Sequence, residues 1–317
     1  MDRNVIQGQE KYLFLGETPH NYNEIIQGKL SLSEKSLNIF KNNIKGRSEY
    51  CKEKGIAYKH FIFPEKTNVL AHLYPHKIVN NILEQSQDYF TKEVIDLSAT
   101  LKSIDFPYLK TDTHLSFDGE VASSIKILSN FFMFEHEKIK NIFEGFKDKG
   151  IEVFCDLGRK LKPQLKEVRY TKKTGFLQRY HNRAGVNDGL FILCLNKEKL
   201  KNGESKRLLI FGDSFMEFNL QFLSYFYSEI LFCRTRYFHK EMVEMFKPDD
   251  LITENIERYL ASINSDDEAP IFNLMYGIRG IESPINAVVY EAYNANLLFG
   301  RKPYKEFLNK FLQEIDD

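Results

Sequence analysis

The first 260 residues alternate between short apolar runs and longer stretches with helical spacing. Strands are predicted by "KYLFLG" (11–16), "IAYKHFIFP" (56–64), "EVIDLS" (93–98), "RLLIFGD" (207–213), "EILFCRT" (229–235) and "DDLITE" (249–254). Apolar residues recur with helical spacing in "SLSEKSLNIFKNNIKGRSEYCKEKG" (31–55), which runs from a serine cap to Gly55, and again after Asp118. Strands that alternate with helices predict an α/β fold with a mostly parallel sheet flanked by helices.

Residues 145–205 depart from this alternation. The runs "IEVFCDLG" (151–158) and "GLFILCLN" (189–196) are strand-like, and the residues between them are rich in charge, Gly and Asn. We interpret 145–205 as an inserted β-rich segment of one domain that spans residues 1–260. The remainder, 261–317, is expected to be a C-terminal helical extension.

Basic residues are concentrated between positions 159 and 183. Nine of them are accompanied by a single acid, Glu167, which gives this stretch a net charge of plus eight. One interpretation is an ordinary solvated loop, and the other is a groove for an anionic sugar polymer or a phosphate-bearing donor. On the second interpretation, Lys172, Lys173 and Arg179 are candidate substrate-binding residues.

The composition excludes several classes of partner and site. The 44 basic and 44 acidic residues cancel, so no general attraction to nucleic acid is expected. No signal peptide and no apolar window of about 18 residues is present, so a cytoplasmic location is expected. Four widely spaced cysteines predict reduced thiols, not zinc ligands or disulfides. His72 and His76 are four residues apart, but Pro75 interrupts the helix that would aim both at a metal, so no metal site is predicted.

The segment "LLIFGDSF" (208–215) joins a predicted strand directly to a predicted helix. Such a junction places Ser214 at the carboxyl edge of the sheet, where α/β folds bind ligands. Amides at the helix start could bind the oxyanion that forms when a serine attacks an ester. Asp213 is expected to bond backbone amides and hold the turn. Ser214 is therefore a candidate nucleophile, with simple helix capping as the alternative.

A serine nucleophile needs a base and a carboxylate that orients the base. The segment "TDTH" (111–114) contains both kinds of residue. In an extended segment, residues two apart project to the same side, so Asp112 could accept a hydrogen bond from one ring nitrogen of His114 while the other nitrogen faces Ser214. The three residues together predict acyl chemistry.

Four segments together resemble the alginate O-acetyltransferase family (AlgX/AlgJ-like), a permuted branch of the SGNH hydrolases. They are "GQEKYLFLG" (8–16), "FIFPEK" (61–66), "TDTHLSFDGE" (111–120) and "FGDSF" (211–215), and the resemblance covers roughly residues 8–260 in collinear order. That family usually writes Asp-Thr-His-Trp, then Asn or Ser, and Gly three residues on. This chain keeps Asp112, Thr113, His114, Ser116 and Gly119 but has Leu115 in place of the tryptophan.

The resemblance implies an SGNH-hydrolase-like fold in which Ser214 is the acyl-accepting nucleophile, His114 its base and Asp112 the orienting carboxylate. The segments "RTRYF" (234–238) and "ENIERYL" (254–260) also resemble family elements, which implies that the substrate site is lined by Arg236, Tyr237 and Arg258. The alternative for the two arginines is a plain salt-bridge role. Lys66 of "FPEK" is expected to lie in a surface turn.

The expected function is serine-dependent O-acetyl transfer to a carbohydrate or polysaccharide acceptor in capsule or surface-polysaccharide biosynthesis, with a synthesis complex at the membrane as a partner. No bound cofactor is expected, but an acetyl donor is required, for which acetyl-CoA is a soluble candidate. Two alternatives remain open: a carbohydrate acetylesterase that uses water as acceptor, and a non-catalytic glycan-binding module of the same fold.

Overall fold

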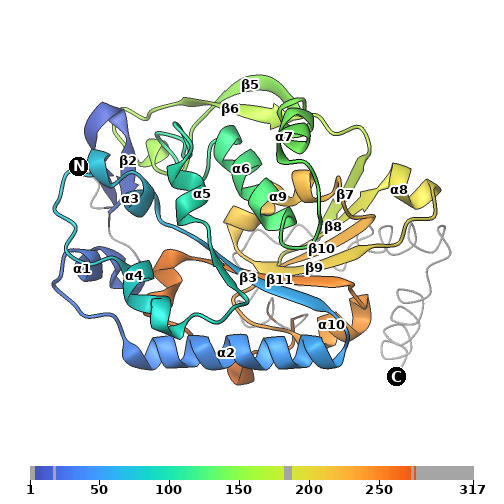
Figure 1. Ribbon diagram of the computed structural model, residues 1–317. Helices are drawn as coiled ribbons and strands as arrows, with labels where there is room; N and C mark the ends of the chain where they lie inside the picture. Colours follow the sequence, from blue (N-terminus) through green and yellow to red (C-terminus); the bar gives the residue numbers. More distant parts are fainter. Residues whose placement is uncertain (1–3, 17–18, 182–187, 273–274, 276–317) are drawn as a thin grey trace, which may run out of the picture. The chain divides into compact units, whose positions relative to one another are not determined.

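The computed structural model of the chain describes residues 4–16, 19–181, 188–272 and 275 (Figure 1). Residues 273–274 and 276–317 of the predicted C-terminal helical extension lie outside these residues, as does Arg183 of the basic stretch.

The largest sheet has seven strands in the order β4-β3-β11-β9-β10-β8-β7. Their bounds are β3 (Ala57–Phe63), β4 (Val94–Asp96), β7 (Leu177–His181), β8 (Phe191–Asn196), β9 (Arg207–Gly212), β10 (Glu229–Arg234) and β11 (Asp250–Ile256). The pairs β3–β4, β9–β10 and β9–β11 are parallel, whereas β8 runs antiparallel to β10 and β7 antiparallel to β8. The predicted α/β fold with a mostly parallel sheet is confirmed.

The chain forms two compact units. The first contains Met1–Gly46, Lys59–Thr174 and Asn255–Asn264, and the second contains Arg47–Tyr58, Gly175–Glu254 and Ser265–Asp317. Each unit is described separately below.

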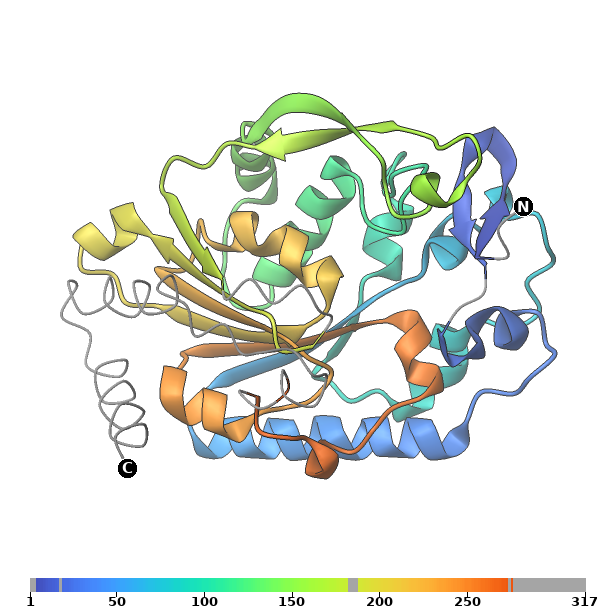
Figure 2. The ribbon, with the colours of Figure 1, turned by 180° about the vertical axis from the view of Figure 1, so that it is seen from behind.

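The first unit contains most of the short helices. Its elements include β1 (Val5–Gln7), β2 (Leu13–Leu15), α1 (Tyr22–Ile26), α3 (Lys66–Val69), α4 (Ile82–Ser86), α5 (Ser98–Lys102), α6 (Phe117–Leu128), α7 (His136–Glu144), β5 (Lys147–Val153) and β6 (Glu167–Lys172). Helices α5, α6 and α7 lie side by side, and the antiparallel pair β5–β6 runs past one end of α6 (Figures 1 and 2). Of the strands in the predicted β-rich segment, β5 and β6 therefore form a sheet of their own, while β7 and β8 extend the large sheet.

Helix α2 (Glu34–Glu53) shows how the sequence pattern becomes structure. Leu37, Phe40, Ile44 and Cys51 follow helical spacing and are all buried. The helix ends where Gly55 adopts a positive φ of 70°, and the amide of Ile56 then bonds the carbonyl of Cys51. Glycine reaches this left-handed conformation without steric cost, so the predicted stop at Gly55 is confirmed.

The second unit is built around buried strands. All residues of β8 and of β11, which belongs to this unit up to Glu254, are buried, and β9 and β10 are buried except for one end residue each. Near-continuous apolar runs of this kind are typical of strands covered on both faces. The helices of this unit are α8 (Lys197–Lys201), α9 (Ser214–Leu223) and α10 (Lys240–Phe246). Within the residues described, no helix combines the length and the apolar composition needed to cross a membrane.

A buried carboxyl group in the first unit links folding stability to pH. The Oε2 atom of Glu257 accepts hydrogen bonds from the amide of Glu65 (2.8 Å) and from Asn68 Nδ2 (3.1 Å) at the start of α3. Burial raises the pKa of Glu257 from 4.5 to about 8. The folded chain therefore retains a proton that the unfolded chain loses, and this stabilising contribution is complete below about pH 4.5 and is lost as the pH rises toward 8.

We therefore expect Glu257→Gln to flatten the pH dependence of stability. The free energy of unfolding of the wild type, measured by urea denaturation, should fall between about pH 5 and 8. In the variant this decrease should be smaller by about a few kcal/mol. Glu137→Gln, on the exposed side of α7, serves as the control. Identical pH slopes for wild type and Glu257→Gln would contradict the assignment.

Candidate active site

The segment 107–116 of the first unit carries the predicted base and its carboxylate. It folds back on itself between α5 and α6 through an isolated bridge between Tyr108 and Leu115 and a bond from the amide of Leu109 to the carbonyl of His114 (3.2 Å). Ser116 then caps α6 by accepting a hydrogen bond from the amide of Gly119 (3.1 Å). A Cβ atom on Gly119 would collide with the carbonyl oxygen of Pro107, so a glycine is required there.

Asp112 and His114 form the pair that their spacing predicts. Asp112 Oδ1 lies 2.7 Å from His114 Nδ1 and also accepts the amide of His114 (3.1 Å). The carboxylate is buried, whereas the His114 side chain is 17% exposed. Burial by itself would raise the pKa of Asp112, but the hydrogen bonds and the charge interaction with His114 outweigh burial and lower it well below its ordinary value. The result is an ionised carboxylate that orients an accessible imidazole.

Two acids that the sequence did not single out hold the backbone of this segment. Glu167 on β6 accepts the amides of Lys110 (2.8 Å) and Thr111 (2.7 Å). Asp156 accepts the amide of Thr113 (2.9 Å) and also its hydroxyl. Glu167 appeared in the sequence only as the one acid within the basic stretch, and no local signal marks Asp156.

Asp156 also brings a third possible metal ligand next to the pair. One ligand atom each of Asp112, His114 and Asp156 lies within 4.8 Å of the others, a spacing that a metal ion could share. These side chains are already occupied, because Asp112 bonds His114 and Asp156 bonds Thr113. Burial, followed by the charge of Asp112, raises the pKa of Asp156, which favours a protonated neighbour over a third anionic ligand.

Ser214 is the first residue of α9 in the second unit, directly after β9 and Asp213, and its side chain is half-buried. Asp213 caps the helix by accepting the amide of Phe215 (2.8 Å), which confirms the structural role expected for Asp213. The Phe215 amide is therefore occupied and is not available to an oxyanion. Because Ser214 belongs to the second unit and Asp112 and His114 to the first, their union in a triad stays a prediction.

A buried carboxyl group on the neighbouring strand, β11, hydrogen-bonds the backbone of the turn that precedes Ser214. Glu254 Oε2 of β11 accepts the amide of Asp213 (2.8 Å). Burial, and then the charge of Asp213, raises the pKa of Glu254 well above its ordinary value. A Cβ atom on Gly212 would lie 2.5 Å from Glu254 Oε2, so this glycine allows the carboxyl to reach the turn.

The lysines of the basic stretch lie in different surroundings. Lys172 ion-pairs with Glu120 (2.6 Å) and its side chain is only 8% exposed, whereas Lys173 is exposed. Arg179 lies on β7 of the second unit, 3.8 Å from Glu217. The net charge of plus eight is thus partly neutralised by acids from outside the stretch.

The remaining candidates also lie apart from one another. Arg236 is exposed and Tyr237 is half-buried, both in the second unit. Arg258, in the first unit, ion-pairs with Glu65. The substrate-binding roles of these residues stay predictions. The surface turn expected for Lys66 is wrong: Lys66 is buried, because backbone carbonyls surround its ammonium group.

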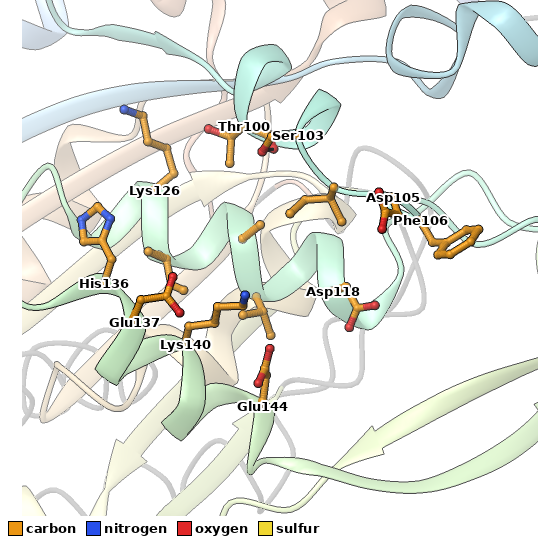
Figure 3. Close-up of a pocket in the computed structure, with 14 residues that line it drawn as sticks. Thr100, Ser103, Asp105, Phe106, Asp118, Lys126, His136, Glu137, Lys140 and Glu144 are labelled. Atoms are coloured by element: carbon orange, nitrogen blue, oxygen red, sulfur yellow. Dashed lines mark hydrogen bonds between the residues drawn. The ribbon is translucent and has the colours of Figure 1, made fainter.

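Two hollows of the first unit adjoin the segment that carries His114. The smaller, of about 170 Å³, includes Leu115, Ser116 and residues 168–170 of β6 in its lining. The larger, of about 620 Å³, lies between α5, α6 and α7, where Asp118 and Lys126 project from α6 and Glu137, Lys140 and Glu144 from α7 (Figure 3). Phe106 and Asp118 line both hollows, and Phe106 is 59% exposed.

Several solved structures share this fold. PatB1 of Bacillus cereus with a sulfonyl adduct is 16% identical with a TM-score of 0.55, and the match covers 81% of this chain and 97% of that one. A DHHW family protein from Eubacterium siraeum is 13% identical with a TM-score of 0.53, covering 87% and 98%. The O-acetyltransferase domain of Pseudomonas putida AlgJ is 12% identical with a TM-score of 0.50, covering 84% and 96%.

No protein-family model and no curated protein matches the chain. The structural likeness at these identities establishes the fold alone. AlgJ is one of the proteins after which the resembled family is named, so the fold that the resemblance implies is confirmed.

Gly212→Ala tests the support of the serine turn. The added methyl group should displace the Glu254 carboxyl and lower the free energy of unfolding by about 1–3 kcal/mol, because β11 is buried and has no room to shift away from it. Gly46→Ala in α2 is the matched control: a Cβ there meets nothing within 4 Å, so it should stabilise the chain by about 0.5–1 kcal/mol. Urea denaturation measures both, and a stabilised Gly212→Ala variant would contradict the packing argument.

Proposed function

We propose that the chain is a serine-dependent O-acetyltransferase that acts on a carbohydrate through an acyl-enzyme. The observation that carries the proposal is the 2.7 Å bond between the buried Asp112 carboxylate and the accessible His114 ring. A carboxylate that fixes one ring nitrogen leaves the other to act as a base. The serine at the start of α9 and the fold shared with the AlgJ O-acetyltransferase domain support the same chemistry.

In the proposed reaction, His114 Nε2 removes the proton of Ser214 as Oγ attacks the acetyl carbonyl of the donor. The positive end of the α9 dipole favours the negative charge that develops there. The C–O or C–S bond to the donor then breaks, and the imidazolium gives its proton to the leaving group. A sugar hydroxyl next attacks the acetyl-serine while His114 accepts its proton, and Ser214 leaves as the alcohol, protonated by His114. Asp112 stabilises the imidazolium in both halves.

The proposal extends to the substrates. Capsule or another surface polysaccharide is the proposed acceptor class, and acetyl-CoA is one soluble donor with a suitable thioester. Hydrolysis of the acyl-enzyme by water would make the chain an acetylesterase, and absence of any acyl-enzyme would leave a glycan-binding module. The two hollows beside the His114 segment offer an exposed aromatic ring on which a sugar can stack.

Ser214→Ala and His114→Ala test the reaction. Each should lower turnover of an activated acetate ester by at least about 10³-fold. The double variant should turn over no more slowly than either single variant, since the effects of residues in one catalytic unit are not additive. Mass spectrometry after brief exposure to the ester should find one acetyl group on the Ser214 peptide of the wild type. Thermal unfolding of each variant controls for the fold. Undiminished turnover in Ser214→Ala would remove this serine from the reaction.

Phe106→Ala tests the acceptor side. Loss of the exposed ring should raise KM for an oligosaccharide acceptor about three- to tenfold, while turnover of the small ester stays at the wild-type rate. Phe154→Ala is the matched control, because Phe154 is also exposed (43%) but lines neither hollow. Equal KM values for both variants would place the acceptor elsewhere.

A further inference from the structure

Lys66 is a buried lysine at the base of the segment that carries Asp112 and His114. It is the first residue of α3 and only 3% exposed. A buried ammonium group is costly unless other groups replace its water. No carboxylate of the described chain lies within ion-pair distance of its Nζ atom, so the compensation must come from elsewhere.

Four backbone carbonyls surround the ammonium group. Lys66 Nζ donates to the oxygens of Leu13 (2.8 Å), Leu109 (2.6 Å), Lys110 (3.0 Å) and Asp112 (2.9 Å). Its charge also lies 5.2 Å from the ring centre of Tyr12 and 5.6 Å from that of Phe14. An ammonium group has three N–H donors for these acceptors, whereas a neutral amine has two and turns a lone pair toward carbonyl oxygen. The charged form therefore satisfies more of these carbonyls than the neutral form does.

Three of the four carbonyls belong to the segment 109–112, immediately before His114. The fourth belongs to β2, whose Leu13 amide bonds Lys110 in turn (2.8 Å). One side chain thus joins the start of α3, strand β2 and the backbone of Asp112. If this connection were lost, the Asp112 backbone would be free to move, and with it the carboxylate that aims His114.

We propose that Lys66 is a positioning residue, whose charged side chain holds the Asp112 backbone and thereby the orientation of the His114 ring. This proposal rests on the function proposed above, in which that ring is the base. It adds a second requirement for activity: a protonated Lys66 as well as an unprotonated His114.

Burial lowers the pKa of Lys66 from 10.5 to about 7, although nearby acidic groups act in the opposite direction. The titratable groups that face Lys66 are Tyr12 beside β2, Lys110 and Asp112 of the segment itself, Cys155 and Asp156 after β5, and Glu167 on β6. Deprotonation as the pH rises through about 7 leaves Lys66 with one N–H donor fewer for the four carbonyl oxygens. Activity should therefore fall on the alkaline side.

The contribution of Lys66 to the free energy of unfolding should change in the opposite direction. The folded-state pKa of Lys66 lies below the unfolded-state value, so between about pH 7 and 10.5 the unfolded chain binds more protons. The contribution of Lys66 to the free energy of unfolding therefore rises with pH across this window and is lost as the pH falls through about 7. A lysine with a structural role alone would give no alkaline loss of activity in the same window.

The test compares Lys66→Met and Lys66→Arg with Lys110→Met. Lys110 is the matched control because its ammonium lies over the same Tyr12 ring (5.1 Å), yet among the residues described its side chain hydrogen-bonds only the carbonyl of Glu10. In Lys66→Met, kcat for an activated acetate ester should fall about 10²-fold with KM nearly unchanged. In Lys66→Arg, which stays charged, the alkaline limb of kcat should disappear. Lys110→Met should match the wild type in both respects.

An NMR measurement separates this proposal from the proposed function. The low-field proton resonance of the bond between His114 Nδ1 and Asp112 Oδ1 should be present in wild type and Lys110→Met and lost in Lys66→Met, whether or not the chain turns over any ester. An unchanged resonance in folded Lys66→Met would overturn the positioning role. If neither Lys66 variant folds, the wild type decides: loss of that resonance as the pH rises through about 7 supports the proposal, and a resonance that persists above this pH overturns it.

Discussion

The constraint on which the candidate active site depends is that buried backbone groups need partners. The segment 109–114 has no regular secondary structure, so side chains take that role. Lys66 binds the carbonyls of Leu109, Lys110 and Asp112, while Glu167 and Asp156 accept amides between them. The carbonyl of Thr111 is bonded by the amides of residues 157 and 158. The charged residues around His114 are thus explained first by hydrogen bonding of a loop, and the loop in turn explains the orientation of the ring.

A side chain also holds the backbone at two other turns. Glu254 accepts the amide of Asp213 at the serine turn, and Glu257 accepts the amide of Glu65 at the start of α3. In both cases burial raises the pKa of the carboxyl group. At Glu254 and Glu257 burial outweighs the hydrogen bond from the backbone amide, so the protonated form is favoured because it carries no charge. Both carboxyl groups therefore bind a proton more tightly in the folded chain than in the unfolded chain.

Charge counted along the sequence was a poor guide to charge on the surface. Lys172 and Glu120 are far apart in sequence but form an ion pair, and Arg169 lies 3.5 Å from the same carboxylate. The acid within the basic stretch, Glu167, is engaged with backbone amides. Of the residues first associated with an anionic ligand, only those left exposed, such as Lys173, keep their charge in solvent. The likeness to solved structures concerns the fold, so the chemistry has to be argued from the side chains of this chain.

The sequence by itself determined the features whose causes are local. Alternating apolar runs predicted the parallel sheet, Gly55 predicted the end of α2, and the two-residue spacing predicted the bond between Asp112 and His114. Only the tertiary structure decided which residues hold those features in place. Lys66 bonds Asp112, 46 positions away, and Glu167 bonds Lys110, 57 positions away. Asp156 bonds Thr113 over 43 positions, and Glu254 bonds Asp213 over 41. Burial and long-range hydrogen bonding arise when distant segments meet, so no local pattern could distinguish these four residues from ordinary surface charges.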